Sequence, residues 1–468
     1  MFPDQNTVQS LIVNKSDKKW LRDSRLSALN HYNELPLEPS PLYAKYDNIL
    51  GSLELNSLST LNELPNIPIP PTLSSNSDKF AGELIQINGS TFSTSTQDDL
   101  LKEGIIYTDL FTAINDHESL LKPFFDNRAI PSNSDKFAAL NQALLNSGAF
   151  LYIPKNIEIS FPFRRLSLIN DSDKGIFSNL IVIVERGSSA SIIDEGHGVP
   201  NSNNSNSVQS NVIEIYLDEG SKFDYHDIQA YDYTTSYFAN KRAVCKKDSQ
   251  ITWTGAYMGS NTIRSRLDTY LQGIGSTTSS IEIVFGTDGQ RFDILSDLTH
   301  RDQNTIGSNI VRGVMKTKAQ ALIKGMIRID QNAKNSKAYL SEHAMLLDKE
   351  SFATAIPGLE VSTNDVKATH ACSVAQIDPE LLFYVMSRGL NYDDAKRVLV
   401  LGFFEPAIQR IPLKDLREMI RKMVRNKWDH TALISDIDKD DLIESPNESE
   451  DDSLQSEKSL FEHHYKYR

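Results

Sequence analysis

From residue 149 onward, the sequence consists of short apolar runs separated by small turns that recur at a nearly constant interval. Four of these turns place a residue that tolerates unusual backbone angles before a serine: Arg186-Gly187-Ser188, Glu219-Gly220-Ser221, Lys247-Asp248-Ser249 and Ile274-Gly275-Ser276. The central residues of these turns lie 27 to 33 positions apart. Many short strands at such spacing, without helices between them, exclude a doubly wound α/β sheet. The pattern favours a stacked β-helix, in which each coil buries its neighbour, over the alternative of a β-sandwich.

Helical patterns flank this region. Apolar residues between Trp20 and Leu29 follow helical spacing, and Asp378-Pro379-Glu380 combines a capping residue with a proline at the first helical position. We therefore predict four parts. They are a helical region over 1–148 with a Ser/Pro-rich insert at about 51–100, a β-helix core over 149–373, a helical region over 374–430, and an acidic disordered tail over 431–468. The tail holds eleven Asp and Glu against four Lys and Arg.

Composition narrows the class of function. The net charge of −14 argues against nucleic acid as a partner. No apolar run reaches the ~18 residues that a membrane span needs, and the N-terminus resembles neither a signal nor a transit peptide. The cysteines are Cys245 and Cys372, which fits a reducing compartment and predicts a cytoplasmic protein. Two thiols are also too few for a cluster held by four thiolates of one chain.

Catalytic motifs are missing from the sequence. It contains no G-x-x-x-x-G-K-[ST] phosphate loop, no H-E-x-x-H, no C-x-x-C and no G-x-S-x-G. Asp224, His226 and Asp227 lie close together, but strand alternation places Asp227 on the opposite face from the other two. We therefore predict that the chain is not an enzyme and has no firm metal site of its own.

A long block near the C-terminus points to a family. Residues 365–406 read DVKATHACSVAQIDPELLFYVMSRGLNYDDAKRVLVLGFFEP. This block resembles the signature of the SufB/SufD family, a histidine-containing strand followed by an IDxxxLFYxxSRG-like helix and a second helix that ends in GFFEP. FANKRAVCKKDSQITWT and LLDKESFATAIPGLEV, farther upstream, resemble strands of the same family.

The resemblance implies a fold and a set of partners. It implies a right-handed parallel β-helix flanked by N-terminal and C-terminal helical regions, in a scaffold subunit of SUF-type iron–sulfur cluster assembly. The C-terminal helices would dock a SufC-type ABC ATPase, and the β-helix would pair with a SufB-like paralogue or with a second copy. An iron–sulfur cluster would be held transiently by the complex, and whether the complex also binds a reduced flavin is left open. This chain alone would hold no stable cofactor.

Departures from the family pattern favour the SufD-like subunit, although the sequence of the C-terminal helices is closer to that of SufB. SufB proteins carry cysteines where this chain has His197, after Gly196, and Glu342, and a glutamate where it has Ala371. His370 is kept, and Cys372 shares its face of the strand. The resemblance therefore yields His370, Glu342, Cys372 and His197 as candidates for cluster assembly or for the subunit interface. For His370 the alternative is a hydrogen-bonded core histidine, and for Cys372 a small buried apolar residue.

Two other functions compete with the scaffold. One is a β-helix enzyme that acts on polysaccharides, and the other is a structural β-helix protein that has lost cluster assembly.

Overall fold

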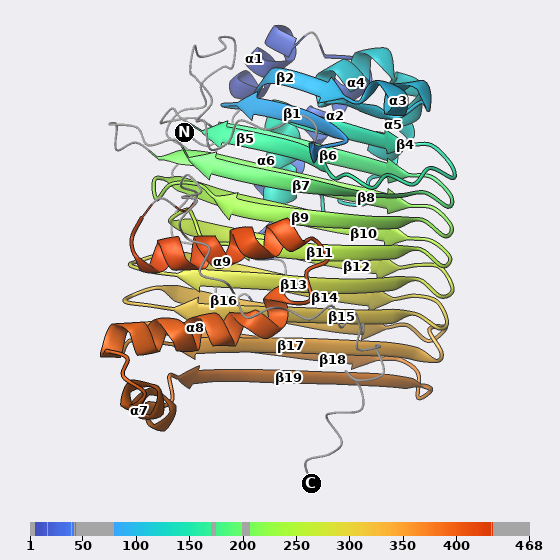
Figure 1. The fold of residues 1–468 in the computed structure, drawn as a ribbon. Helices are drawn as coiled ribbons and strands as arrows, with labels where there is room; N and C mark the ends of the chain where they lie inside the picture. Colours follow the sequence, from blue (N-terminus) through green and yellow to red (C-terminus); the bar gives the residue numbers. More distant parts are fainter. Residues whose placement is uncertain are drawn as a thin grey trace. The chain divides into compact units, whose positions relative to one another are not determined.

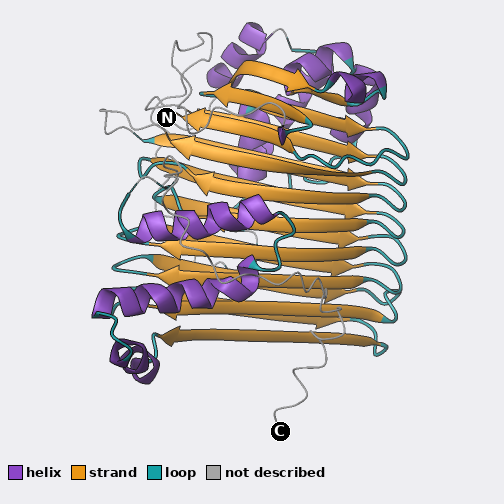
Figure 2. Cartoon of the chain, viewed as in Figure 1, coloured by secondary structure: helices purple, strands orange, loops and turns teal. Residues whose placement is uncertain are grey.

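In the computed structural model, residues 5–15, 17–38, 79–169, 175–198 and 206–431 are described, with single positions 40, 41, 43 and 433. Most apolar runs form strands that belong alternately to two sheets (Figures 1 and 2). Sheet A contains β1 Gly82–Ile87, β2 Ser90–Thr96, β5 Phe163–Ile169, β7 Ser189–Gly198, β9 Lys222–Ala230, β11 Gln250–Tyr257, β13 Thr277–Gly286, β15 Ile306–Met315, β17 Ser336–Leu346 and β19 Val366–Gln376. Sheet B contains β3 Ile106–Asp109, β4 Ser147–Ile153, β6 Gly175–Val184, β8 Ser207–Leu217, β10 Thr235–Cys245, β12 Thr262–Leu271, β14 Arg291–His300, β16 Gln320–Ile329 and β18 Phe352–Val361.

From β4 onward, each strand pairs in parallel with the strand two places along the chain, so the chain winds as a two-sheet solenoid. The register offset runs from 26 residues, between Ser236 and Thr262, to 33 residues, between Ser189 and Lys222. This agrees with the interval between the turns in the sequence. Apolar side chains from the facing sides of both sheets form the core, among them Val182, Ile215 and Trp253. The predicted mainly β fold, a parallel β-helix with helices at both ends, is confirmed.

The four recurring turns stack on one another. Gly187, Gly220, Asp248 and Gly275 all have positive φ angles, between +55° and +74°. The backbone amide of each donates to a carbonyl of the next turn along, as from Gly220 N to Lys247 O at 2.9 Å. In the last three of these turns, the serine that follows closes the turn by donating from its hydroxyl to a carbonyl three residues earlier, as from Ser249 to Lys246 at 2.7 Å, whereas the Ser188 hydroxyl donates to Pro154 O. The turn signal in the sequence therefore has a direct backbone cause.

The first helices pack against the early coils. They are α1 Gln5–Lys15, α2 Lys19–Glu34, α3 Asp98–Lys102, α4 Leu110–Asp116, α5 Glu118–Asp126 and α6 Lys136–Leu144. Their apolar faces contact outward side chains of sheet B, including Phe177 and Phe238. Asp135 caps α6 by accepting from the amides of Phe137 and Ala138 at 2.8 and 3.0 Å.

The N-terminal region is less helical than we expected. Residues 82–96, which we predicted to belong to a Ser/Pro-rich insert, form the antiparallel hairpin β1–β2 on the first coil. Asn88 and Gly89 at its tip both have positive φ, as a tight hairpin turn requires. Residues 51–78 of the predicted insert, and all of the predicted acidic tail except 431 and 433, lie outside the described residues.

Three helices follow the last strand: α7 Pro379–Ser387, α8 Tyr392–Ile408 and α9 Lys414–Trp428. Figure 1 shows α8 and α9 running across sheet A, while α7 follows β19 directly. Phe404 and Trp428 pack on Phe285 of β13, with ring centroids 6.2 and 6.4 Å away. The second helix extends past Pro406, where we expected it to end. No helix within the described ranges has the length and apolar character that a membrane crossing requires.

Candidate functional site

The last coil brings three of the four candidate residues together. In the described part of the chain, β19 pairs with β17 on one side and is the outermost strand of sheet A. The parallel register sets Cys372 opposite Glu342, and His370 opposite Leu340. Because alternate side chains of a strand share a face, the side chains of His370, Cys372 and Glu342 all face the same side of the sheet.

That side is the interior of the solenoid. One position from each strand of sheet A between β5 and β19 lines up in a continuous column of Arg165, Asp194, Asp227, Gly255, Glu282, Val311, Glu342 and Cys372. We call this set the inner column. Its direction is fixed by contacts that cross to sheet B, since Lys241 of β10 donates to Asp227 at 2.8 Å. Ionisable groups therefore lie inside the solenoid from its early coils to its open edge.

Charges at the start of the inner column are compensated. Arg165 lies 3.3 Å from Asp194, whose carboxylate also accepts from the Tyr225 hydroxyl at 2.8 Å. Asp227 forms its ion pair with Lys241 and is approached by the hydroxyl of Tyr237 at 3.2 Å. All these groups are buried, so each charge is matched within hydrogen-bond distance, as burial requires.

Glu342 lacks such compensation. Its side chain is fully buried, and neither carboxyl oxygen accepts a hydrogen bond of regular geometry. The space it occupies exists because residue 325 is glycine: a Cβ there would lie 2.7 Å from Glu342 Oε1. Burial raises the pKa of Glu342 to about 8, helped by the carboxylates of Asp297 and Glu282 and opposed by the Ile356 amide. At neutral pH this side chain is therefore mainly protonated, and binding a metal through it would release a proton.

Cys372 and His370 are exposed at the edge, unlike the other cysteine. Cys245 is buried in the core, and its burial raises the thiol pKa to about 12. Imidazole, thiol and carboxyl are all groups that bind iron. Nevertheless, within the described ranges no three His, Cys, Asp or Glu side chains are grouped so that they could hold a metal ion. The edge thus offers ligand types for iron without a complete ligand set.

His197 is not part of this arrangement. It lies on β7, and β9, β11, β13 and β15 separate that strand from β17 in the sheet. His197 lies three positions after Asp194 on the same strand, so its side chain is on the opposite face and points outward. There its Nε2 lies 3.2 Å from Glu195, which also pairs with Arg164 at 3.0 Å. Burial favours the neutral form of Glu195, but His197 and Arg164 outweigh it and lower its pKa to about 2.

Asp224, His226 and Asp227 are likewise divided between two faces of β9, as alternation predicts. Asp227 faces inward, and His226 is buried on the outer side with no hydrogen-bond partner for either ring nitrogen. Burial lowers the pKa of His226 to about 3, so this ring is neutral at physiological pH. These three residues do not form a metal site.

Sequence reasoning missed two features. The inner column was detectable as charged residues at inward positions of otherwise apolar strands. The second feature is an apolar surface on α7 and the start of α8, which we call the α7–α8 surface. It consists of residues that are 38 to 73% exposed: Leu381, Phe383, Tyr384, Leu390, Tyr392 and Val398.

Comparisons with known proteins agree with this architecture. The family model described as the SufBD core domain of SUF system FeS cluster assembly matches residues 167–403, and the SufBD protein N-terminal region matches residues 78–164. The chain is 26% identical over 431 residues to the iron–sulfur cluster assembly protein SufD of Bacillus subtilis, covering 91% of this chain and 98% of that protein. It is also 26% identical over 433 residues to SufBD family proteins of Staphylococcus epidermidis and Staphylococcus aureus, covering 89% of this chain and 91% of each relative.

The core match alone spans half of the chain. It begins in β5 of the solenoid and ends in α8, so it includes most of the features described above. The predicted family is confirmed, and SufD stands among the relatives. The chain therefore belongs to the SufBD family of iron–sulfur cluster assembly scaffold proteins.

Proposed function

We propose that this chain is the SufD-like half of an assembly complex. It docks a SufC-type ATPase through the α7–α8 surface and pairs through β18 and β19 with a SufB-like subunit or a second copy. The cluster is cargo of the complex, held transiently, and this chain alone keeps no stable cofactor. The α7–α8 surface is the observation that carries the proposal.

The helix α7 is well formed but scarcely buried. Asp378 caps it by accepting from Glu380 N at 2.8 Å, Pro379 occupies its first turn, and Gly389 with φ of +100° follows its end. Only Leu382 of its residues is buried. Phe383, at 73% exposed, is the most exposed large apolar side chain described. Six large apolar side chains exposed within a short stretch of chain support a site that another protein covers.

The open edge supports pairing. An outermost strand presents unpaired backbone groups to a partner, and natural proteins leave such an edge bare mainly where it is used. On β19 this edge carries His370 and Cys372. A paired subunit would place its own side chains beside them and so complete the ligand set that this chain leaves open.

The positions of the acids favour the scaffold over a polysaccharide-active enzyme. A glycosidase needs two carboxyl groups that flank a sugar in an accessible groove. Asp194 and Asp227 are instead buried between the sheets and paired with Arg165 and Lys241.

Replacing one side chain of the α7–α8 surface tests the docking proposal. Phe383→Asp should weaken binding of the SufC-type ATPase by at least ~30-fold, the loss of about 2 kcal/mol that defines a hot spot. Titration calorimetry with the purified full-length chain measures this. Phe92→Asp is the matched control, because Phe92 is 45% exposed on β2 at the other end of the solenoid. If the ATPase binds the wild-type chain, Phe383→Asp and Phe92→Asp with equal affinity, docking at this surface is refuted.

A further inference from the structure

A buried lysine connects the α7–α8 surface to the last coil. Lys396 lies one turn into α8 and is only 8% exposed. Its Nζ donates to Leu347 O at 3.1 Å and lies 3.4 Å from Asp348 Oδ1. Lysine is almost never so buried unless it is paired, so this contact holds the start of α8 to the turn between β17 and β18.

The turn that receives Lys396 is fixed to the solenoid on its other sides. Asp348 Oδ2 accepts from Thr317 N, in the preceding turn on the same side, at 2.7 Å. Leu347 N donates to Met315 O at 2.9 Å, and Ile377 N, just before α7, donates to Leu346 O at 3.0 Å. Displacement of this turn would therefore move β18 and the end of β17, the strand that carries Glu342.

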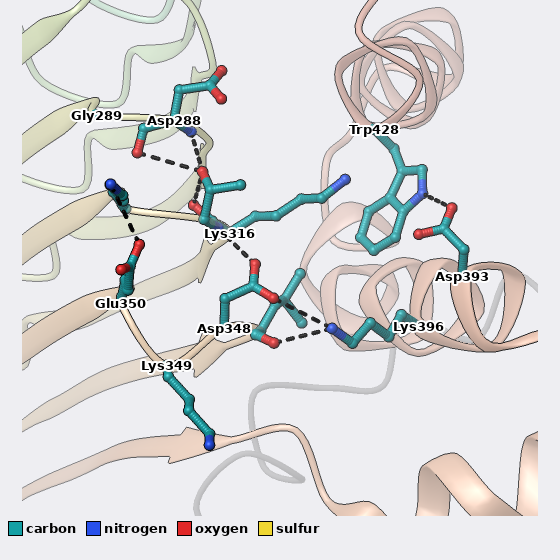
Figure 3. Close-up of a pocket in the computed structure, with 12 residues that line it drawn as sticks. Asp288, Gly289, Lys316, Asp348, Lys349, Glu350, Asp393, Lys396 and Trp428 are labelled. Carbon is teal, nitrogen blue, oxygen red and sulfur yellow. Dashed lines mark hydrogen bonds and ion pairs between the residues drawn. The ribbon is translucent and has the colours of Figure 1, made fainter.

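The contact spans a hollow. A pocket of about 730 Å³ lies between these turns and the helices, lined by Asp348 and Lys396, with Lys316, Trp428 and Asp393 among the other lining residues. Figure 3 shows the side chain of Lys396 extending from α8 toward Asp348. The apolar packing of α8 lies farther along, at Val400, Phe404, Ala407 and Ile408. The start of α8 is thus held mainly by polar links, from Lys396 to the turn and from Trp428 Nε1 to Asp393 at 3.0 Å, whereas its second half is held by dense apolar packing.

We propose that Lys396 is a positioning residue that couples occupation of the α7–α8 surface to the turn at residues 347–351 and, through it, to the open edge. This inference rests on the proposed docking of an ATPase. Tyr392 and Val398, which flank Lys396 on α8, belong to the surface that the partner would cover. A shift of α8 on docking is transmitted to the turn because Lys396 bonds to a backbone carbonyl as well as to a carboxylate. The edge strand responds at Cys372, whose neighbour in register is Glu342.

The reaction of Cys372 with a thiol reagent tests the coupling. The rate at which an aromatic disulfide reagent modifies Cys372 is measured in the full-length chain under three conditions: alone, with the SufC-type ATPase added, and with the ATPase and ATP added. We expect the ATPase, with or without ATP, to change the rate at Cys372 by at least about fivefold, the lower end of typical coupling between sites. Lys396→Met should still bind the ATPase, because the α7–α8 surface is intact, but should lose this change. Lys349→Met is the control, since Lys349 lines the same pocket but is exposed.

The outcomes separate the two proposals. If the wild-type chain does not bind the ATPase, the docking proposal is refuted, and so is the inference that rests on it. Binding without a change of rate at Cys372, or a change that persists in Lys396→Met, overturns the inference alone. A persisting change would mean that the ATPase shields the thiol directly. If Lys396→Met does not fold, Asp348→Asn weakens the same link from the turn and carries the same expectation.

Discussion

At the scale of single residues, Glu342 is the least compensated group of the inner column. Within the described residues its buried carboxyl forms no ion pair, and the charged groups that raise its pKa are two further carboxyls, those of Asp297 and Glu282. Its chemistry follows from this environment: it holds a proton at pH values at which an ordinary glutamate has lost one. A side chain of the same shape that cannot ionise would therefore change how stability depends on pH.

Glu342→Gln should stabilise the protein in a manner that depends on pH. The pKa is 4.5 in the unfolded chain and about 8 in the folded one, so the folded state binds the extra proton between these values. The contribution of Glu342 to stability is therefore greatest below pH 4.5 and falls as pH rises to 8. The variant escapes this loss, which amounts to a few kcal/mol at ~1.4 kcal/mol per pKa unit. Thermal unfolding at pH 5 and pH 8 measures the difference.

The control for this series is Glu103→Gln, at an exposed position after α3, which should leave the pH dependence unchanged. A Glu342→Gln variant whose advantage is the same at both pH values would show that Glu342 is ionised in the folded chain throughout this range.

The two cysteines should differ strongly in reactivity. Cys372 is exposed, whereas Cys245 is buried with its pKa raised to about 12, so almost none of its thiol is ionised near neutral pH. Iodoacetamide at pH 8 should label one thiol in the native chain and two after denaturation, as intact mass spectrometry would show. Native Cys372→Ser should remain unlabelled; labelling of that variant would contradict the burial of Cys245.

At the scale of elements, the turns and the C-terminal helices are stabilised in different ways. The turns are held by backbone angles that few residues adopt, and they repeat in each coil. The helices α8 and α9 are held by side chains, since Lys427 donates to Gln290 at 2.6 Å and Trp428 packs on Phe285. Burial lowers the pKa of Lys427 to about 7, so the end of α9 is tied down by a lysine whose charge is only partly retained.

Two glycine turns should respond differently to alanine. Both Gly220 and Gly275 have positive φ, which costs a residue with a Cβ ~1–2 kcal/mol. A Cβ at Gly220 meets nothing within 4 Å, whereas a Cβ at Gly275 would lie 2.3 Å from Asp248 Oδ1 in the preceding turn. Gly275→Ala should therefore lower the melting temperature more than Gly220→Ala does. Equal losses in calorimetry would mean that the Asp248 side chain moves aside without cost.

At the scale of the whole molecule, stability should vary along the solenoid. Each inner coil is covered by neighbours on both sides, but the last coil is covered on one side only within the described residues. Most of β19 is exposed, whereas β14 is almost entirely buried. Stacked repeats derive much of their stability from the interfaces between neighbours, so the terminal coil opens most easily.

Hydrogen exchange followed by mass spectrometry checks this directly. Peptides from β19 should exchange faster than peptides from β13 and β14 in the isolated chain, and they should slow down when a paired subunit covers the edge. Uniform protection of all these strands in the isolated chain would contradict an open edge.

The sequence predicted the solenoid well because its turns obey local rules that need no knowledge of distant contacts. It did not predict the inner column to the same extent. Glu342 and Cys372 are 30 residues apart, which fits one coil, but a change of one residue in the offset would turn one of them to the other face. The hairpin β1–β2 was missed because Ser- and Thr-rich residues resemble a linker when Asn88-Gly89 is not read as a turn.

The remaining differences come from tertiary contacts. His197 was grouped with the edge residues through the family comparison, but the number of coils between β7 and β17 separates them. Lys396 gave no signal, because a lysine near the start of a helix ordinarily lies in solvent. Only the folding of α8 back over sheet A buries it.

That return of the last helices has a consequence for how the protein is made. The strand β13 leaves the ribosome well before Phe404 and Trp428, the side chains that cover Phe285. A nascent chain therefore carries a bare apolar strip on completed coils until translation is almost finished. The cell must shield that strip during synthesis. A chain released by a ribosome that stalls before α9 would have a folded solenoid with an exposed apolar strip, and it would be prone to aggregate.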